Sequence, residues 1–87
     1  MKRHIKIYCD YFGISEQDDK RLCEHCRIRL ITDIHHIKPR GMGGKNEKVD
    51  VIENLIGLCR NCHILAESKK LSKEYLFDIH YKNLKQA

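Results

Sequence analysis

Four of the five cysteines in this 87-residue chain form two pairs with the same spacing. Two residues separate Cys23 from Cys26, and two residues separate Cys59 from Cys62. This gap lets both thiolates of a pair reach one ion, and two such pairs supply the tetrahedral sulfur set that suits a structural zinc. The pattern therefore predicts a zinc ion that ties together the ends of the 32-residue segment between the pairs.

A disulfide framework is the alternative interpretation of these cysteines. The odd cysteine count disfavours it, and so does the expected lack of a secretion signal, because disulfides persist in oxidising compartments. A redox Cys-x2-Cys motif would not explain a second copy. We expect the fifth cysteine, Cys9, to be a small buried hydrophobe without a chemical role.

Three histidines and one asparagine have the side chains of a hydrolytic site. His35 and His36 lie between the cysteine pairs, Asn54 follows them, and His63 comes directly after Cys62. Because the zinc would hold His63 against the segment that carries the histidine pair, the imidazoles are expected to converge. They could bind a second metal ion with open coordination positions, or one neutral imidazole could act as a general base. We expect surface or core positions without a catalytic role for the other three histidines, His4, His25 and His80.

The net charge of +5 comes entirely from the segment between Lys20 and Lys48, which has eight basic and three acidic residues. Such a patch suits a polyanion, because each cation that neutralises a phosphate releases a counterion. Taken alone, the charge fits a solvated surface at least as well.

Hydrophobic spacing indicates the elements that must position these residues. Apolar residues recur at helical spacing from Ile5 to Phe12 and stop at Gly13, which predicts an N-terminal helix, although the alternation of Ile5 and Ile7 leaves a strand possible. We expect a strand or hairpin at residues 29–37, a glycine loop at 41–46 and a second strand at 55–58. Two helices are expected to follow, at 60–69 and at 72–85.

The last helix is expected to begin at a Ser72 N-cap and to bury Tyr75, Leu76 and Ile79. Together the elements predict one α+β domain over residues 1–87 with a small core. No apolar stretch approaches the length of a membrane span, and the basic residues 1–6 are not followed by the apolar segment of a signal peptide, so a cytoplasmic location is expected.

From Cys23 to His63 these motifs resemble the HNH endonucleases. The resemblance lies in Cys-x2-Cys, then His-His-Ile with Pro-Arg-Gly-Met-Gly-Gly, then Glu-Asn-Leu-Ile-Gly-Leu-Cys-x2-Cys-His. It implies a ββα-metal fold, in which two strands and a helix hold one divalent ion beside a four-cysteine zinc. The motif core would span residues 23–63, with an N-terminal extension at 1–22 and a C-terminal helix at 72–85.

The resemblance implies that His36 is the general base, that His35 and His63 bind the catalytic ion, and that Asn54 orients the base through backbone hydrogen bonds. On a regular strand, neighbouring side chains point to opposite faces. The base and the ion would then lie on opposite sides of the phosphate, unless the strand is distorted near Pro39.

One departure from the family concerns the metal. Many members have Asp where this chain has His35, and paired histidines resemble instead the colicin nucleases. Two imidazoles favour Mn²⁺, Co²⁺, Ni²⁺ or Zn²⁺ over Mg²⁺, which prefers oxygen. Asp33, two residues earlier on the same strand face, could supply an oxygen ligand.

The expected function is metal-dependent hydrolysis of phosphodiester bonds in double-stranded DNA, with weak sequence specificity because no base-reading helix is evident. Cationic side chains and the amides of the glycine loop are expected to hold the DNA backbone. The candidate cations are Lys38, Arg40 and Lys45. Such a domain would suit restriction, phage genome packaging or mobile-element transfer.

Two non-catalytic alternatives remain open. A zinc-stabilised module that binds DNA or RNA would share the cysteines and the basic segment, but it would have no need of His36, Asn54 and His63 together. A protein-interaction domain of the RING type would require a second complete ligand set for a second structural ion.

Overall fold

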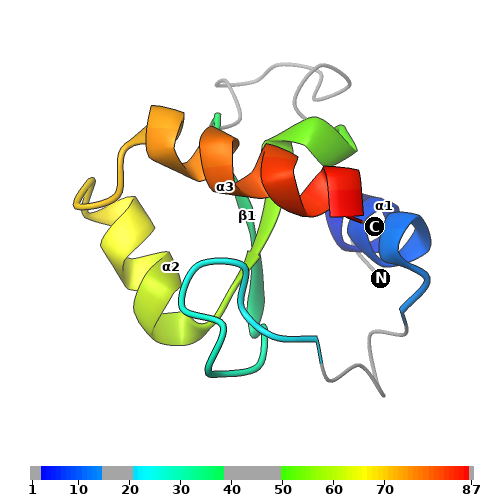
Figure 1. The fold of residues 1–87 in the computed structure, drawn as a ribbon, viewed down its shortest axis with the longest axis horizontal. Helices are drawn as coiled ribbons and strands as arrows, with labels where there is room; N and C mark the ends of the chain where they lie inside the picture. Colours follow the sequence, from blue (N-terminus) through cyan, green and yellow to red (C-terminus); the bar gives the residue numbers. More distant parts are fainter. Residues whose placement is uncertain (1–2, 15–20, 39–49, 87) are drawn as a thin grey trace.

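Two short antiparallel strands lie at the centre of the molecule (Figure 1). β1 (Asp33–His36) pairs with β2 (Leu55–Leu58), and Asp33 lies opposite Leu58. All four residues of β2 are buried, whereas those of β1 are partly exposed, in keeping with its polar side chains. The structure is a computed structural model that describes residues 3–14, 21–38 and 50–86.

Three α-helices surround the strands. In the described residues these are α1 (Arg3–Phe12), α2 (Arg60–Glu67) and α3 (Lys73–Gln86), and the 3-10 turn η1 (Ile52–Asn54) leads into β2. In Figure 1, α1 and α2 lie on opposite sides of the strands and α3 spans the space between them. The domain is therefore α+β, as the sequence predicts, with one helix available to each face of β1.

The N-terminal helix is confirmed, and its buried face is the one the hydrophobic spacing indicates. Tyr8 and Cys9 are buried. Gly13 has φ +66°, a left-handed conformation that glycine adopts without steric cost, and the helix ends there. The following N–H, of Ile14, donates to the carbonyl of Cys9 at 3.0 Å and closes the last turn.

The strand expected over residues 29–37 is shorter than predicted. Leu30 instead forms an isolated bridge with Leu22, and the N–H of Ile31 donates to the carbonyl of Arg21 at 3.0 Å. These bonds fold the chain back on itself around the first cysteine pair, which uses the backbone groups that a longer β1 would need.

Two details of the helices also differ from prediction. The helix expected over residues 60–69 ends at Glu67, because Lys69 has φ +64° and cannot continue it. In α3, Leu76 is buried as expected, but Tyr75 is 43% exposed. The N-cap is confirmed, since the hydroxyl of Ser72 accepts a hydrogen bond from the N–H of Tyr75 at 3.1 Å. In the described part of the chain, no helix combines the length and apolar character needed to cross a membrane.

A buried polar network joins the elements around Glu24. The carboxylate of Glu24 accepts hydrogen bonds from the Tyr8 hydroxyl at 2.6 Å, the Gly57 N–H at 2.8 Å and the Asn83 amide at 3.0 Å. Nδ1 of His80 lies 2.7 Å from the same carboxylate. His80 is thus a core residue that connects α3 to the loop of the first cysteine pair. A core position is one of the two that were expected for it from the sequence.

Candidate functional site

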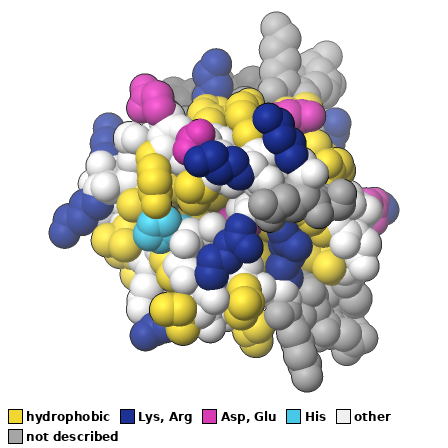
Figure 2. Space-filling model, viewed as in Figure 1, with side chains coloured by type: hydrophobic (Ala, Val, Ile, Leu, Met, Phe, Trp, Pro, Cys, Tyr) yellow, Lys and Arg dark blue, Asp and Glu magenta, His cyan; other side chains and the backbone are white. Residues whose placement is uncertain are grey.

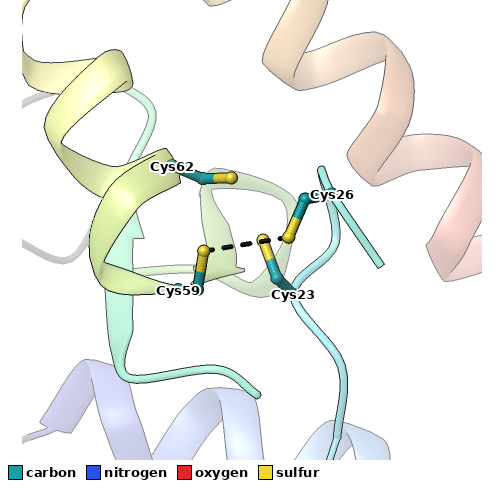
Figure 3. Close-up of side chains that lie close together, drawn as sticks. All are labelled: Cys23, Cys26, Cys59 and Cys62. Carbon is teal, nitrogen blue, oxygen red and sulfur yellow. Dashed lines mark hydrogen bonds between the residues drawn. The ribbon is translucent and has the colours of Figure 1, made fainter. Parts of the chain in front are cut away.

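The four paired cysteines converge on one point (Figure 3). Cys23 and Cys26 come from the loop before β1, Cys59 is the N-cap of α2 and Cys62 lies on its first turn. All four sulfurs lie within 4.8 Å of one another, and those of Cys26 and Cys59 are 3.8 Å apart. A tetrahedral zinc with Zn–S bonds of about 2.3 Å separates its sulfurs by about 3.8 Å. The donor set therefore fits a structural zinc.

The surroundings of the cysteine cluster act differently on two of its thiols, because burial and the neighbouring cysteines raise the pKa of Cys62, whereas the backbone favours the thiolate of Cys26. Hydrogen bonds from the backbone N–H groups of Arg29 and Ile28 lower the pKa of Cys26 to about 6. Nδ1 of His25 lies 3.3 Å from the sulfur of Cys62. His25, for which the sequence indicated no role, therefore contacts the cluster and can hydrogen-bond to one of its ligands.

A second group of possible metal ligands lies between β1 and α2. His35, His63 and Glu67 each offer one donor atom, and these atoms lie within 4.8 Å of one another. The rings of His35 and His63 are 5.0 Å apart between centroids, and Nε2 of His63 is 3.1 Å from a Glu67 oxygen. Sequence reasoning missed Glu67, although its place four residues after His63 puts both side chains on one face of a helix.

His36 lies on the other face of β1. Its Nε2 is 2.7 Å from an oxygen of Asp50, a carboxylate that is 4% exposed. Its ring also packs against His4 of α1, with 4.7 Å between ring centroids. Neighbouring side chains of β1 therefore alternate between its two faces as in a regular strand, with His35 facing α2 and His36 facing α1. Asp50 was also missed, because it lies 14 residues from His36 and no local spacing relates them.

Asn54 fixes the backbone just after the histidine pair. Its side-chain oxygen accepts a hydrogen bond from the N–H of Lys38 at 2.7 Å, and its amide nitrogen donates to the carbonyl of Lys38 at 3.0 Å. The N–H of Ile37 donates to the carbonyl of Asn54 at 3.0 Å. Three hydrogen bonds therefore hold the end of β1 against η1. The Lys38 side chain is exposed, whereas Arg40, Lys45 and the predicted glycine loop at 41–46 lie outside the described residues.

A family model of the HNH endonucleases matches residues 23–69, which is more than half of the chain. The chain belongs to the HNH endonuclease family. The match begins at the first cysteine of the zinc cluster and extends past Glu67, so it contains both groups of possible metal ligands. Comparisons with curated proteins and with solved structures gave no match. Membership of the family implies a catalytic metal and a DNA substrate, and the four-cysteine cluster suggests a structural zinc.

In this HNH endonuclease domain, the surroundings of His35 favour the neutral imidazole that a metal ion requires. Burial and the proximity of His63 lower the pKa of His35 to about 4, so its imidazole is neutral near pH 7 and retains a lone pair. Asp33 lies 3.3 Å from Nδ1 of His63. Nε2 of the same ring faces the carboxylate of Glu67 at 3.1 Å, so both ring nitrogens point at carboxylate oxygens. An ion bound at Nε2 would take the place of a proton there, while Asp33 would accept a hydrogen bond from Nδ1. Among the described residues, the carboxylate in the donor group is that of Glu67 and not that of Asp33.

A groove of about 760 Å³ is bordered by several residues of the HNH site. Both His35 and His36 border it, although their rings lie on opposite faces of β1. Glu67 of α2 borders it as well. A phosphate in this groove would have His35 and Glu67 of the three-donor group among its neighbours, and His36 as well.

Proposed function

We propose that the protein is a metal-dependent endonuclease that hydrolyses phosphodiester bonds in double-stranded DNA with weak sequence specificity. One observation carries the proposal: His35 and Glu67 of the metal-ligand group and His36, whose ring is held by Asp50, border one groove. A module that only binds nucleic acid has no use for an imidazole held by a buried carboxylate beside a second metal-ligand group.

The proposed base is Nδ1 of His36. The carboxylate of Asp50 accepts the proton of Nε2, so the neutral ring presents its lone pair at Nδ1, which can take a proton from the attacking water. Asn54 holds the backbone behind this ring in place. A divalent ion held by His35, His63 and Glu67 would offset the negative charge that develops on the phosphate and on its leaving oxygen.

The charge of the molecule supports a polyanionic substrate. The chain has a net charge of +5, and Lys and Arg side chains are prominent near the centre of the face in Figure 2. The exposed Lys38 lies two residues after the end of β1 and is suited to a contact with the DNA backbone. Arg40 and Lys45 are proposed as further backbone contacts from the sequence alone.

Nicking of supercoiled plasmid tests the proposal. Zinc-loaded protein is incubated with the plasmid and with Mn²⁺, Ni²⁺ or Mg²⁺, and the wild type is compared with His36→Ala. The variant is expected to lose about 10²- to 10⁴-fold in rate, the contribution of a general base, with unchanged zinc content and DNA affinity. DNA binding without nicking in any of these ions would instead identify a binding module. Full activity of His36→Ala would refute the assignment of the base.

The hydrogen bond from His36 to Asp50 can be tested separately. Asp50→Asn replaces one acceptor oxygen by an amide that donates, which removes the preference for a proton on Nε2. We expect kcat to fall while KM stays close to the wild-type value, because Asp50 acts through His36 and not on the DNA. A variant with unchanged kcat would show that this carboxylate does not position the base.

A further inference from the structure

The groove extends beyond the residues of the proposed active site. Its lining combines β1, the end of α2 and the beginning of α3. Ile37, Ala66, Leu71 and Leu76 provide an apolar part of the wall. Exposed residues of the turn between α2 and α3 and of the first turn of α3 provide a polar rim. The rim residues are Lys69, Ser72, Lys73 and Glu74.

This rim is cationic where it adjoins the metal-ligand group. Lys69 follows Glu67 by two residues, and residues 68–73 contain three lysines and no acidic residue. Two carboxylates also border the groove. Glu74 would repel an anion, whereas a metal ion bound by the group that contains Glu67 would neutralise the charge of Glu67. The charges therefore complement a polyanion that continues from the active site along the turn.

The backbone of Lys69 adopts a conformation that glycine usually takes. Lys69 has φ +64° at the position just beyond α2, where its N–H donates to the carbonyl of Ala66 at 3.2 Å. Side chains with a Cβ disfavour this conformation, and glycine is the common residue at such a position. A lysine here costs stability relative to glycine, so replacement of Lys69 by glycine should remove the cation without harming the turn.

We propose that this groove binds the phosphate next to the scissile one on the same DNA strand, with Lys69 and Lys73 as its cationic contacts. The apolar wall would lie against the adjoining sugar and base. The groove volume of about 760 Å³ is within the range of sites that hold ligands of nucleotide size. This inference rests on the proposed function, since it assigns the path of the strand on one side of the cleaved bond.

Equilibrium binding to a short DNA duplex without added catalytic metal tests the groove independently of cleavage. Zinc-loaded wild type, Lys69→Ala and Lys73→Ala are compared by fluorescence anisotropy over a range of salt concentrations. Lys85→Ala is the matched control, because Lys85 is an exposed lysine near the opposite end of α3. Each groove variant is expected to weaken binding several-fold and to reduce the log–log salt slope by roughly one. Groove variants that behave like Lys85→Ala would overturn the inference.

Lys69→Gly separates binding from folding. Glycine relieves the left-handed backbone, so the Tm should equal or exceed that of the wild type, while DNA affinity should fall as in Lys69→Ala. A Lys69→Gly variant with wild-type affinity would overturn the inference whatever its Tm.

Plasmid nicking by the same variants distinguishes the two proposals. Nicking by the wild type, with no change of affinity in the groove variants, refutes the groove and leaves the nuclease. Loss of affinity in those variants, without nicking by the wild type in any metal, shows that the groove binds a DNA phosphate but refutes the nuclease, and with it the assignment of that phosphate as the neighbour of a scissile one.

Discussion

Replacing the buried Glu24 by Gln is expected to destabilise the whole domain. Glu24 is 3% exposed and its partner His80 is fully buried. Nδ1 of His80 faces the carboxylate at 2.7 Å, and Nε2 faces the carbonyl of Ile52 at 2.6 Å. Both ring nitrogens therefore point at oxygen acceptors, which is the arrangement of an imidazolium paired with a carboxylate. Glu24→Gln would leave this buried cation without a counter-charge.

The magnitude follows from the burial of both groups. Removing one partner of a buried ion pair costs about 3–5 kcal/mol. A domain of this length has a total stability of roughly 4–13 kcal/mol, so the loss is a large fraction of it. At about 4–8 °C per kcal/mol, the Tm of Glu24→Gln should be at least about 12 °C below that of the wild type.

The effect should also depend on pH. Burial disfavours the charged form of Glu24, but hydrogen bonding and charge from His80, together with the Tyr8 and Gly57 donors, outweigh it and lower the pKa of this carboxyl. A carboxyl with a lower pKa in the folded state stabilises the fold above its unfolded pKa, and that contribution is lost as the pH falls through the folded pKa. The Tm difference between wild type and Glu24→Gln should be complete at pH 7 and shrink below about pH 4.3.

Thermal unfolding followed by circular dichroism measures these differences, with zinc content checked at each pH. Glu53→Gln is the matched control, since Glu53 is exposed and its substitution should change stability by less than about 0.5 kcal/mol. In a double-mutant cycle, Glu24→Gln with His80→Gln should be less destabilised than the sum of the single variants. A Glu24→Gln variant within about 1 kcal/mol of the wild type, with additive effects in the cycle, would refute the buried pair.

Three further substitutions test the zinc, the core and the catalytic metal. Cys59→Ser should leave the chain largely unfolded and without zinc, because metal binding and folding are coupled in a domain this small; a well-dispersed NMR spectrum would contradict this. Gly57→Ala should cost about 1–3 kcal/mol in urea denaturation, since a Cβ would lie 2.5 Å from Ile31 and 2.6 Å from the Tyr8 oxygen; unchanged stability would show that both side chains can move aside. His35→Asp should raise the rate of cleavage in Mg²⁺ relative to Mn²⁺ or Ni²⁺, whereas full activity of His35→Ala would exclude this histidine as a ligand.

Patterns that are local in the sequence determined much of this protein. Two residues between cysteines bring their sulfurs to one ion, so the cysteine spacing is sufficient to predict the cluster. The Ser72 cap and the buried stripe of α1 follow from helical geometry in the same way. Glu67 belongs to this class too, because it lies four residues after His63 on one helix, a spacing that is present in the sequence although the predicted ligand set did not include it.

Only the tertiary structure decided the partners that come from distant parts of the chain. Asp50 reaches His36 because the strands and η1 bring their ends together, and Glu24 meets His80 across 56 residues because α3 packs over the loop of the first cysteine pair. The two faces of β1 were likewise assigned by packing: α2 covers His35 and α1 covers His36. Periodicity shows which residues share a face of one element. Which elements meet across that face depends on how the complete set of helices and strands buries its apolar surface.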